Sequence, residues 1–369
     1  ANHLETTVLT LSAASGTGGV YITQTSAVTV DTVSVEVQRV ASTATATAQT
    51  FTQSDLTSTS NGNLVLVAKA GTITLNAGLV ADTTLSAVIA HGSGSVLLDA
   101  QGTGSDVVLR GKVTSGTGHI SILAADEMLV GQGGTATEIS TSSLGTIHLL
   151  ATTGALVMLG SSRIIATDSA LRLSAGTSVS LGNVVASNVS VRAGGGAITN
   201  ASGSTKNLTA STLRLSAQAA IGAAGLHLTT NVGTLTALST GTGTAGIFLT
   251  EDNSLTVDTV TVSVTAFSST ATTSTVTDAD QSDLVTGNNG QIVLVAGGTV
   301  TLNGGTSEDN NKAVSANGTG SVLIDVNTGS LVIGSDIVSS TGHITLKAQS
   351  GISLSAGADV LTASTGTVS

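Results

Sequence analysis

Three stretches of this 369-residue chain repeat one short pattern: Ala170-Leu-Arg-Leu-Ser-Ala175, Val189-Ser-Val-Arg-Ala193 and Thr212-Leu-Arg-Leu-Ser-Ala217. Apolar and polar residues alternate within each stretch, which is the period of a β-strand with one buried face. The stretches lie about 20 to 24 residues apart and are bounded by Gly, Ser, Thr or Asn, which favour turns. Short strands that recur at this spacing predict the coils of a parallel β-helix, or β-solenoid.

The same alternation predicts which side chains enter the core of that solenoid. Arg172, Arg192 and Arg214 are expected to point outward at neighbouring levels. The expected inward residues are Leu171, Leu173, Val189, Val191, Leu213 and Leu215. The absence of Pro has a cause in this fold, because each interior strand must donate backbone N–H groups to its neighbours. A β-sandwich is the rival fold, but it needs hairpin signals and marked corners, whereas similar strands recur here at coil spacing.

Composition supports one long core over several compact ones. Hydrophobic residues make up 40% of the chain and charged residues 9%, which argues against disorder. Only 1% is aromatic, although compact cores normally use aromatic side chains. We therefore expect residues 1–369 to form one continuous all-β solenoid of about 17 coils and about 80 Å.

Net charge and hydropathy limit the partners. The formal charge is −11, and the Lys and Arg residues form no basic stripe, which disfavours nucleic acid and anionic membranes. No apolar run approaches the roughly 20 residues of a membrane helix, so membrane insertion is not expected.

A second repeat, about 227 residues long, encloses the short one. Tyr21-Ile-Thr23 and Val28-Thr-Val-Asp-Thr-Val33 recur as Phe248-Leu-Thr250 and Leu255-Thr-Val-Asp-Thr-Val260, and residues 16–145 resemble residues 243–369. The second copy ends at 366–369, which aligns with a strand of the first copy. We expect either a longer tandem array or an open end that the next molecule completes.

Two Ser- and Thr-rich segments interrupt the regular pattern, at residues 40–63 and 267–289. Both are expected to be elaborated loops that project once per long repeat. We expect surface loops without a binding role, and partner binding is the alternative, because projections from a regular scaffold often bind partners.

The acidic and histidine residues carry little sign of chemistry. The cluster most like the carboxylates of polysaccharide-cleaving β-helix enzymes is Asp278, Asp280 and Asp283. The first copy has only one counterpart, Asp55, so we expect solvated loop acids in preference to a calcium site. Acidic turns are also expected at 251–253 and 308–311. His119 and His343 occupy equivalent Thr-Gly-His-Ile contexts, which favours a structural role along the stack. A Ser-His-Asp triad is neither supported nor excluded. No catalytic, cofactor-binding or metal-binding residue is predicted.

Several segments resemble the β-strand repeats of large bacterial exoproteins, similar to filamentous-haemagglutinin and autotransporter-adhesin stalks. The segments that carry the resemblance are Asn207–Ala217, Ile221–Gly222, Leu226–Thr230, Val232–Thr236 and Gly246–Glu251, and His3–Thr7, Leu9–Ser12 and Gly19–Thr23 repeat the phrase. The resemblance covers nearly the whole chain. It implies a secreted, right-handed β-helix at the bacterial cell surface, with no catalytic residues and no cofactor.

The sequence therefore predicts a structural extracellular protein and no enzyme: a rigid segment of an adhesin stalk, filament or sheath. Its expected partner is itself, head to tail and laterally, with host-cell or matrix glycans as further partners. One alternative is a glycan-binding or glycan-degrading β-helix, although aromatic residues for sugar stacking are scarce. The other is an ice-binding solenoid built on Thr-x-Thr pairs such as Thr72/Thr74, Thr259/Thr261 and Thr299/Thr301.

Overall fold

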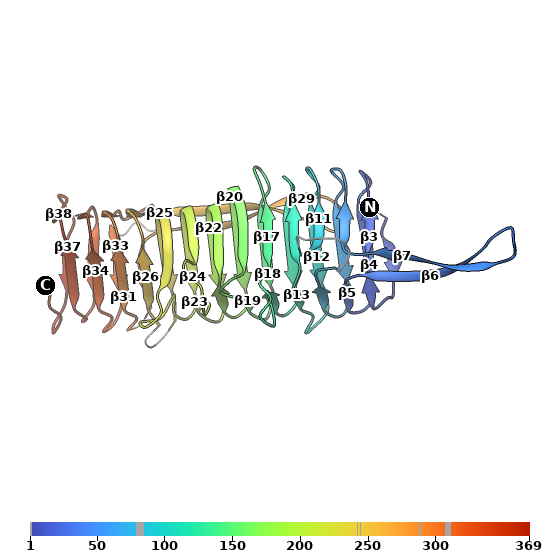
Figure 1. Ribbon diagram of the computed structural model, residues 1–369. Helices are drawn as coiled ribbons and strands as arrows, with labels where there is room; N and C mark the ends of the chain where they lie inside the picture. The colour runs from blue at the N-terminus through green and yellow to red at the C-terminus, as the bar shows by residue number, and fades with distance from the viewer. Residues whose placement is uncertain (1, 79–84, 242, 244, 288, 307–310) are drawn as a thin grey trace.

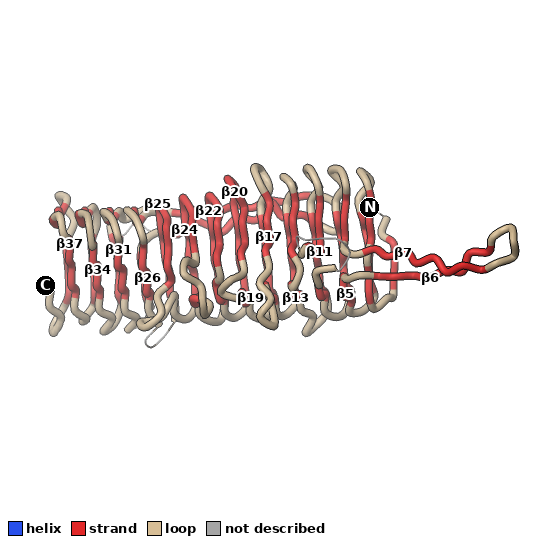
Figure 2. The backbone as a smooth tube through the Cα atoms, in the orientation of Figure 1, coloured by secondary structure: helices blue, strands red, loops and turns tan. Residues whose placement is uncertain are grey.

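The computed structural model describes the chain except residues 1, 79–84, 242, 244, 288 and 307–310 (Figure 1). The described residues form 39 strands, mostly parallel, and contain no helix (Figure 2). Accordingly, this part of the chain has no helix long and apolar enough to span a membrane. The strands stack along one long axis with the two termini near opposite ends (Figure 1). The prediction of an all-β chain built from parallel strands is confirmed.

The N-terminal part contains three parallel ladders, which we number 1 to 3. Ladder 1 contains β1 (Leu4–Thr6), β4 (Val20–Gln24), β9 (Leu64–Ala68), β12 (Val96–Ala100), β15 (Ile120–Ala124) and β18 (Ile147–Ala151). Ladder 2 contains β2 (Thr10–Leu11), β5 (Val28–Val30), β10 (Ile73–Leu75), β13 (Val107–Leu109), β16 (Met128–Val130), β19 (Leu156–Met158), β21 (Val179–Leu181) and β23 (Ile198–Asn200). Ladder 3 contains β3 (Ala13–Ser15), β8 (Leu56–Ser58), β11 (Ser86–Ala90), β14 (Lys112–Ser115) and β17 (Glu138–Thr141).

Four longer strands then belong to ladder 3 and ladder 1 at the same time. They are β20 (Arg163–Ala175), β22 (Asn183–Ala193), β24 (Leu208–Ala217) and β25 (Leu228–Ser239). The first half of each continues ladder 3 and the second half continues ladder 1, as the pairs Ile164↔Val184 and Leu173↔Val191 illustrate. Each of the three short stretches that repeat in the sequence lies in one of these strands.

Strand β25 divides among three new ladders, numbered 4 to 6, of the C-terminal part. Its residues Leu228, Leu235 and Ala237 pair with Leu249, Val257 and Leu284, one in each new ladder. Ladder 4 contains β26 (Ile247–Glu251), β31 (Ile292–Ala296), β34 (Val322–Val326) and β37 (Ile344–Ala348). Ladder 5 contains β27 (Leu255–Val257), β32 (Val300–Leu302), β35 (Ser330–Ile333) and β38 (Gly351–Leu354). Ladder 6 contains β30 (Leu284–Thr286), β33 (Lys312–Ala316), β36 (Asp336–Ser339) and β39 (Val360–Thr362).

The long repeat reappears in this pairing and begins earlier than residue 16. Leu4 pairs with Ile22 as Leu228 pairs with Leu249, so the first strands of the chain are equivalent to β25. Ladders 1 to 3 of the first copy correspond to ladders 4 to 6 of the second. Leu235 of β25 pairs with Leu213 of ladder 1 on one side and with Val257 of ladder 5 on the other. Ladder 5 therefore continues ladder 1, although its equivalent in the first copy is ladder 2.

One aliphatic core runs between the ladders. Its buried members extend from Val20 to Ala358, and they include all six side chains expected to point inward, each with no measurable exposure: Leu171, Leu173, Val189, Val191, Leu213 and Leu215. Parallel pairing in register places each of them over an aliphatic side chain of the next strand, as in Leu171↔Val189 and Val189↔Leu213. Aliphatic side chains therefore suffice for a core that is narrow but long.

The two interrupting segments are antiparallel hairpins, in place of the elaborated loops that the sequence suggested. The N-terminal hairpin comprises β6 (Val33–Val40) and β7 (Ala46–Gln53), and the central hairpin comprises β28 (Val260–Phe267) and β29 (Thr273–Gln281). Only the N-terminal hairpin projects away from the strand stack, beyond its N-terminal end, whereas the central hairpin lies along the stack (Figures 1 and 2).

Two equivalent polar side chains are buried at strand ends, Gln24 in the first copy and Glu251 in the second. Gln24 Oε1 accepts hydrogen bonds from Thr6 Oγ1 at 2.7 Å and from the backbone N–H of Val8 at 3.2 Å. Glu251 accepts the equivalent bonds, at 2.7 Å from Thr230 Oγ1 and at 3.1 Å from the N–H of Val232. The acidic turn expected at 251–253 is therefore buried at its first residue. Burial raises the pKa of Glu251 against the opposing effect of these hydrogen bonds.

The pair supplies a matched test of this buried position. We expect Glu251→Gln to retain or slightly raise the free energy of unfolding, because the first copy already places Gln there and the buried charge disappears. Glu251→Ala should lower it by about 2 kcal/mol, because the Val232 N–H and the Thr230 hydroxyl lose their acceptor. Urea denaturation followed by circular dichroism measures both. Equal destabilisation by the two substitutions would contradict this account.

Candidate functional site: the hairpin contact on ladder 1

The outward face of ladder 1 carries one column of side chains that changes character along its length. Parallel register stacks each residue on the next. The column, named here the ladder 1 column, runs Tyr21, Val65, Leu97, Ser121, His148, Arg172, Ser190, Arg214 and Thr236. Its N-terminal end is mainly apolar and the remainder is polar or charged.

The central hairpin lies across this column. Strand β28 contacts β15, β18, β20, β22, β24 and β25 in turn. Alternation along β28 buries Val260, Val262 and Val264 against the stack and leaves Thr261 and Ser263 exposed. The hairpin is thus amphipathic, with its valine face on the ladder 1 column.

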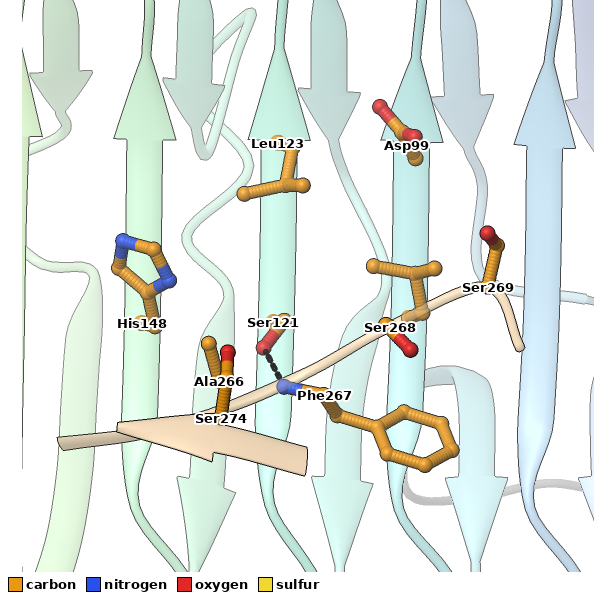
Figure 3. Close-up of a pocket in the computed structure, with 10 residues that line it drawn as sticks. Asp99, Ser121, Leu123, His148, Ala266, Phe267, Ser268, Ser269 and Ser274 are labelled. Atoms are coloured by element: carbon orange, nitrogen blue, oxygen red, sulfur yellow. Dashed lines mark hydrogen bonds between the residues drawn. The ribbon is translucent and has the colours of Figure 1, made fainter. Parts of the chain in front are cut away.

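The tip of the hairpin makes the apolar part of the contact. Phe267 is only 4% exposed and packs with Val65, Val67 and Leu97. Its backbone N–H donates to Ser121 Oγ at 2.8 Å (Figure 3). A cavity of about 270 Å³ remains beside Phe267, and its other lining residues include Asp99 and His148.

Hydrogen bonds fasten the hairpin at both ends. At the root, Gln281 Nε2 donates to the carbonyl oxygen of Leu215 at 2.9 Å. Nearer the tip, Thr146 Oγ1 donates to the Thr265 carbonyl at 2.8 Å and accepts from the Thr265 N–H at 3.1 Å. In the turn between β28 and β29, the carbonyl oxygen of Ser269 lies 2.8 Å from His3 Nε2.

A charged cluster occupies the middle of the contact. Arg172 donates to both carboxylate oxygens of Asp278, from Nε at 2.9 Å and from Nη2 at 3.1 Å, which is the bidentate geometry. Ser190 Oγ donates to Asp278 Oδ2 at 2.7 Å, and Arg214 Nε donates to the Ala279 carbonyl at 3.1 Å. The side chains of Arg172 and Asp278 are 12% and 10% exposed, so water screens the pair weakly. His148 Nε2 lies 3.2 Å from Arg172 Nη1.

Burial and charge set the pKa values in this cluster. Burial, reinforced by the Arg172 charge, lowers the pKa of His148 to about 4 and keeps the imidazole neutral at pH 7. Burial by itself would raise the pKa of Asp278. The hydrogen bonds from Arg172 and Ser190, with the charges of Arg172 and Arg214, outweigh that effect and hold this pKa below its usual value. Asp278 is therefore an ionised anchor.

These positions correct one expectation about the charged residues and confirm another. Asp278, Asp280 and Asp283 do not form a group of solvated loop acids: Asp278 binds Arg172, Asp283 is buried, and only Asp280 is exposed, where it accepts from Thr261. The three arginines point outward as expected, but Arg172 and Arg214 share one column, whereas Arg192 lies between Ser174 and Ser216 in another.

The expected structural role of His119 and His343 is confirmed. His119 Nδ1 lies 3.0 Å from Thr146 Oγ1, and His343 Nδ1 lies 2.9 Å from Thr367 Oγ1, each one level further along the stack. The glycine before each histidine is required by packing, because a Cβ atom on Gly118 would lie 2.2 Å from the carbonyl oxygen of Gly94.

The remaining candidates were a Ser-His-Asp triad and the acidic groups. Ser190 donates to Asp278 and not to His148, so the hydrogen bonds do not follow the order of a Ser-His-Asp triad. In the part of the chain that the structure describes, no three His, Asp or Glu side chains are grouped to hold a metal ion. Of the acidic turn expected at 308–311, residues 308–310 lie outside the described residues.

The Thr-x-Thr pairs of the ice-binding alternative do not extend into long stacks. Thr74 stacks on Thr29, but its other neighbour in ladder 2 is Val108. Thr301 ends a run of four stacked threonines, Thr212, Thr234, Thr256 and Thr301, which Asn188 precedes and Val332 follows. The remaining pair, Thr259 and Thr261, lies at the root of the central hairpin.

Comparison with protein-family models, curated proteins and solved structures finds no match to this chain. The site is therefore interpreted by comparing the two copies of the long repeat.

The Arg172–Asp278 pair is expected to hold the hairpin against the column. Asp278→Asn leaves Arg172 without its carboxylate and should favour detachment by about 2 kcal/mol, roughly a 30-fold change. Detachment exposes Phe267, so chymotrypsin should cleave after Phe267 about 30 times faster than in the wild type. Cleavage after the exposed Phe51 serves as the internal reference, and the exposed Asp280→Asn is the matched control. Unchanged cleavage after Phe267 in D278N would contradict the role of the pair.

The low pKa of His148 predicts a pH dependence of stability. The folded state keeps the imidazole neutral down to about pH 4, whereas the unfolded chain binds a proton near pH 6.5. Stability from this residue is therefore full above pH 6.5 and declines by about 3 kcal/mol as the pH falls to about 4. The difference in unfolding free energy between the wild type and His148→Gln, measured from pH 7 to 4, should show this loss. A pH-independent difference would overturn the assignment.

Proposed function

We propose that the chain is a structural segment of a bacterial surface protein, with no catalytic role. In this proposal the parallel ladders close into a right-handed β-helix, with coils of about 20 to 24 residues as the basic unit. The rod serves as part of an extracellular adhesin stalk, filament or sheath. The observation that carries the proposal is the continuous aliphatic core, which runs from Val20 to Ala358 beneath the parallel ladders.

The spacing of paired residues supports the coil as the unit. Outside the crossings that contain a hairpin, paired residues lie from 18 positions apart, as in Leu173 and Val191, to 34 positions apart, as in Ile73 and Val107. The 18-residue spacing occurs between β1 and β4 and between β20 and β22, and the longer crossings carry extra turn residues. Each crossing returns the chain one strand spacing further, so chain length is converted into rod length.

The product of this architecture is stiffness. In the described ladders the interior strands pair on both edges, and their core side chains stack on those of the strands before and after them, as Val189 does between Leu171 and Leu213. Bending the rod would stretch the ladders on one side and compress the core on the other. Such a rod holds a terminal binding domain, or a neighbouring rod, at a set distance from the cell.

We further propose that copies associate head to tail, and laterally through their side faces. The first and last strands of the described residues have unpaired edges and core-type side chains, which the next coils of a longer array or another copy would cover: Leu4 is 66% exposed, although its equivalent Leu228 is fully buried. At the other end, Ile352 and Leu354 continue the column of Leu331 and Ile333 and are about half exposed. Covering these groups by another copy favours association through apolar burial. Host-cell or matrix glycans are the further partners that we propose.

Electron microscopy of the purified chain tests the structural proposal. The strands stack in 14 levels from β1 to β37, fewer than the roughly 17 coils expected from the sequence. We expect straight rods whose length grows with protein concentration in steps of about 65 Å, the length of these levels at the strand spacing. Immunogold labelling of intact source cells should place the protein outside the membrane. Compact or flexible particles of constant size, or label confined to the cytoplasm, would overturn the proposal.

A further inference from the structure

The N-terminal hairpin carries an exposed apolar face in the half nearer its root. Val35, Val37 and Phe51 on this face are 53%, 43% and 55% exposed. Val33, Val35 and Val37 alternate with polar residues, and Phe51 pairs directly with Val35, so these side chains share one face. A lone two-stranded hairpin is marginally stable in water, and this one gains little from the stack it projects from.

The central hairpin displays the docked form of the same element. Both hairpins occupy the same place in the long repeat, between ladders 2 and 3 in one copy and between ladders 5 and 6 in the other. The repeat aligns Val35 and Val37 with Val262 and Val264, which are 1% and 2% exposed because they lie on the ladder 1 column. Val40 takes the position of Phe267 at the tip. The central hairpin lies on coils that precede it, and the N-terminal hairpin points beyond the first strands of the chain (Figure 1).

The second copy contains the face that corresponds to the ladder 1 column. On ladder 4, parallel register stacks Phe248, Val293, Leu323 and Thr345, which we name the ladder 4 column. Val65 and Leu97 of the ladder 1 column are 1% exposed beneath the central hairpin. Their equivalents Val293 and Leu323 are half-buried and line an open groove of about 350 Å³, together with Ser321, His343, Thr345 and Lys347.

The two unused surfaces also match in chemistry. In the docked contact, Asp278 of the hairpin pairs with Arg172 of the ladder 1 column. The N-terminal hairpin has Phe51 in place of that aspartate, and the ladder 4 column has no charged residue among its four members. An apolar hairpin face thus corresponds to an apolar column, as the charged hairpin corresponds to the charged column.

We propose that the N-terminal hairpin of one molecule docks along the ladder 4 column of a second copy of this chain. The docked hairpin lies across β31, β34 and β37 with its valine face on Val293 and Leu323. The inference rests on the proposed head-to-tail association and specifies one of its contacts. Each rod carries the N-terminal hairpin at one end and the ladder 4 column near the other. Successive molecules are thereby joined along their flanks as well as at their ends.

Disulfide trapping tests the contact, because the chain contains no cysteine of its own. Val37→Cys is mixed with Val293→Cys or Leu323→Cys under mild oxidation, and disulfide-linked dimers are counted on a non-reducing gel. We expect at least one mixture to yield ten times more dimer than the matched control, Val264→Cys with the same partners. Val264 is the equivalent valine of the central hairpin and is buried within its own molecule.

A second measurement separates this inference from the function on which it rests. Val35→Lys with Val37→Lys should weaken association at least tenfold in sedimentation velocity, whereas Glu36→Lys on the opposite hairpin face should change it little. If wild-type rods lengthen but the double substitution and the cysteine mixtures have no effect, the hairpin contact is wrong and head-to-tail association stands. If Val37→Cys links only to itself, hairpins pair with hairpins and the proposal is overturned. If the wild type stays monomeric at every concentration, both proposals fail.

Discussion

Parallel hydrogen bonding between successive strands, in register, is the constraint on which the rest of the structure depends. A strand of this chain cannot satisfy its backbone groups alone, so each crossing must place the next strand directly over the last. Register then fixes which side chains stack, because each residue lies directly over the residue it pairs with in the next strand. Leu171, Val189 and Leu213 form a continuous core for this reason, and the chain manages with almost no aromatic residues.

The same register orders the outer surface into columns, and the columns explain where the hairpins bind. The ladder 1 column is apolar near Val65 and charged near Arg172, and the central hairpin matches it with Phe267 at the tip and Asp278 further back. Duplication of the unit duplicates both hairpin and column. Because residues of β25 pair with three different ladders, the central hairpin that follows lies on strands that precede it, from β15 to β25. The N-terminal hairpin and the ladder 4 column are the halves of that contact that are not joined within one molecule.

Much of the fold was predictable because it is local and repetitive. Alternation identified the strands, their spacing indicated parallel stacking, and the inward residues were assigned correctly. The equivalence of His119 and His343 was enough to indicate bonding along the stack. The hairpins were missed as secondary structure, although Val33-Ser-Val-Glu-Val37 alternates cleanly, because Ser and Thr dominate the segments and obscure the strand pattern.

The site itself was beyond the sequence. Arg172 and Asp278 are separated by 106 positions, and nothing in their neighbourhoods links them. In the sequence Glu251 resembled a turn residue. Its burial could not be predicted, because it depends on a contact with the backbone N–H of Val232 on the neighbouring strand. The sequence by itself determined the strand period, the aliphatic core and the duplication, all of which follow from residue spacing. Only the tertiary structure decided which hairpin lies on which column, because that contact depends on how strands far apart in the sequence stack and on the change of ladders at β25.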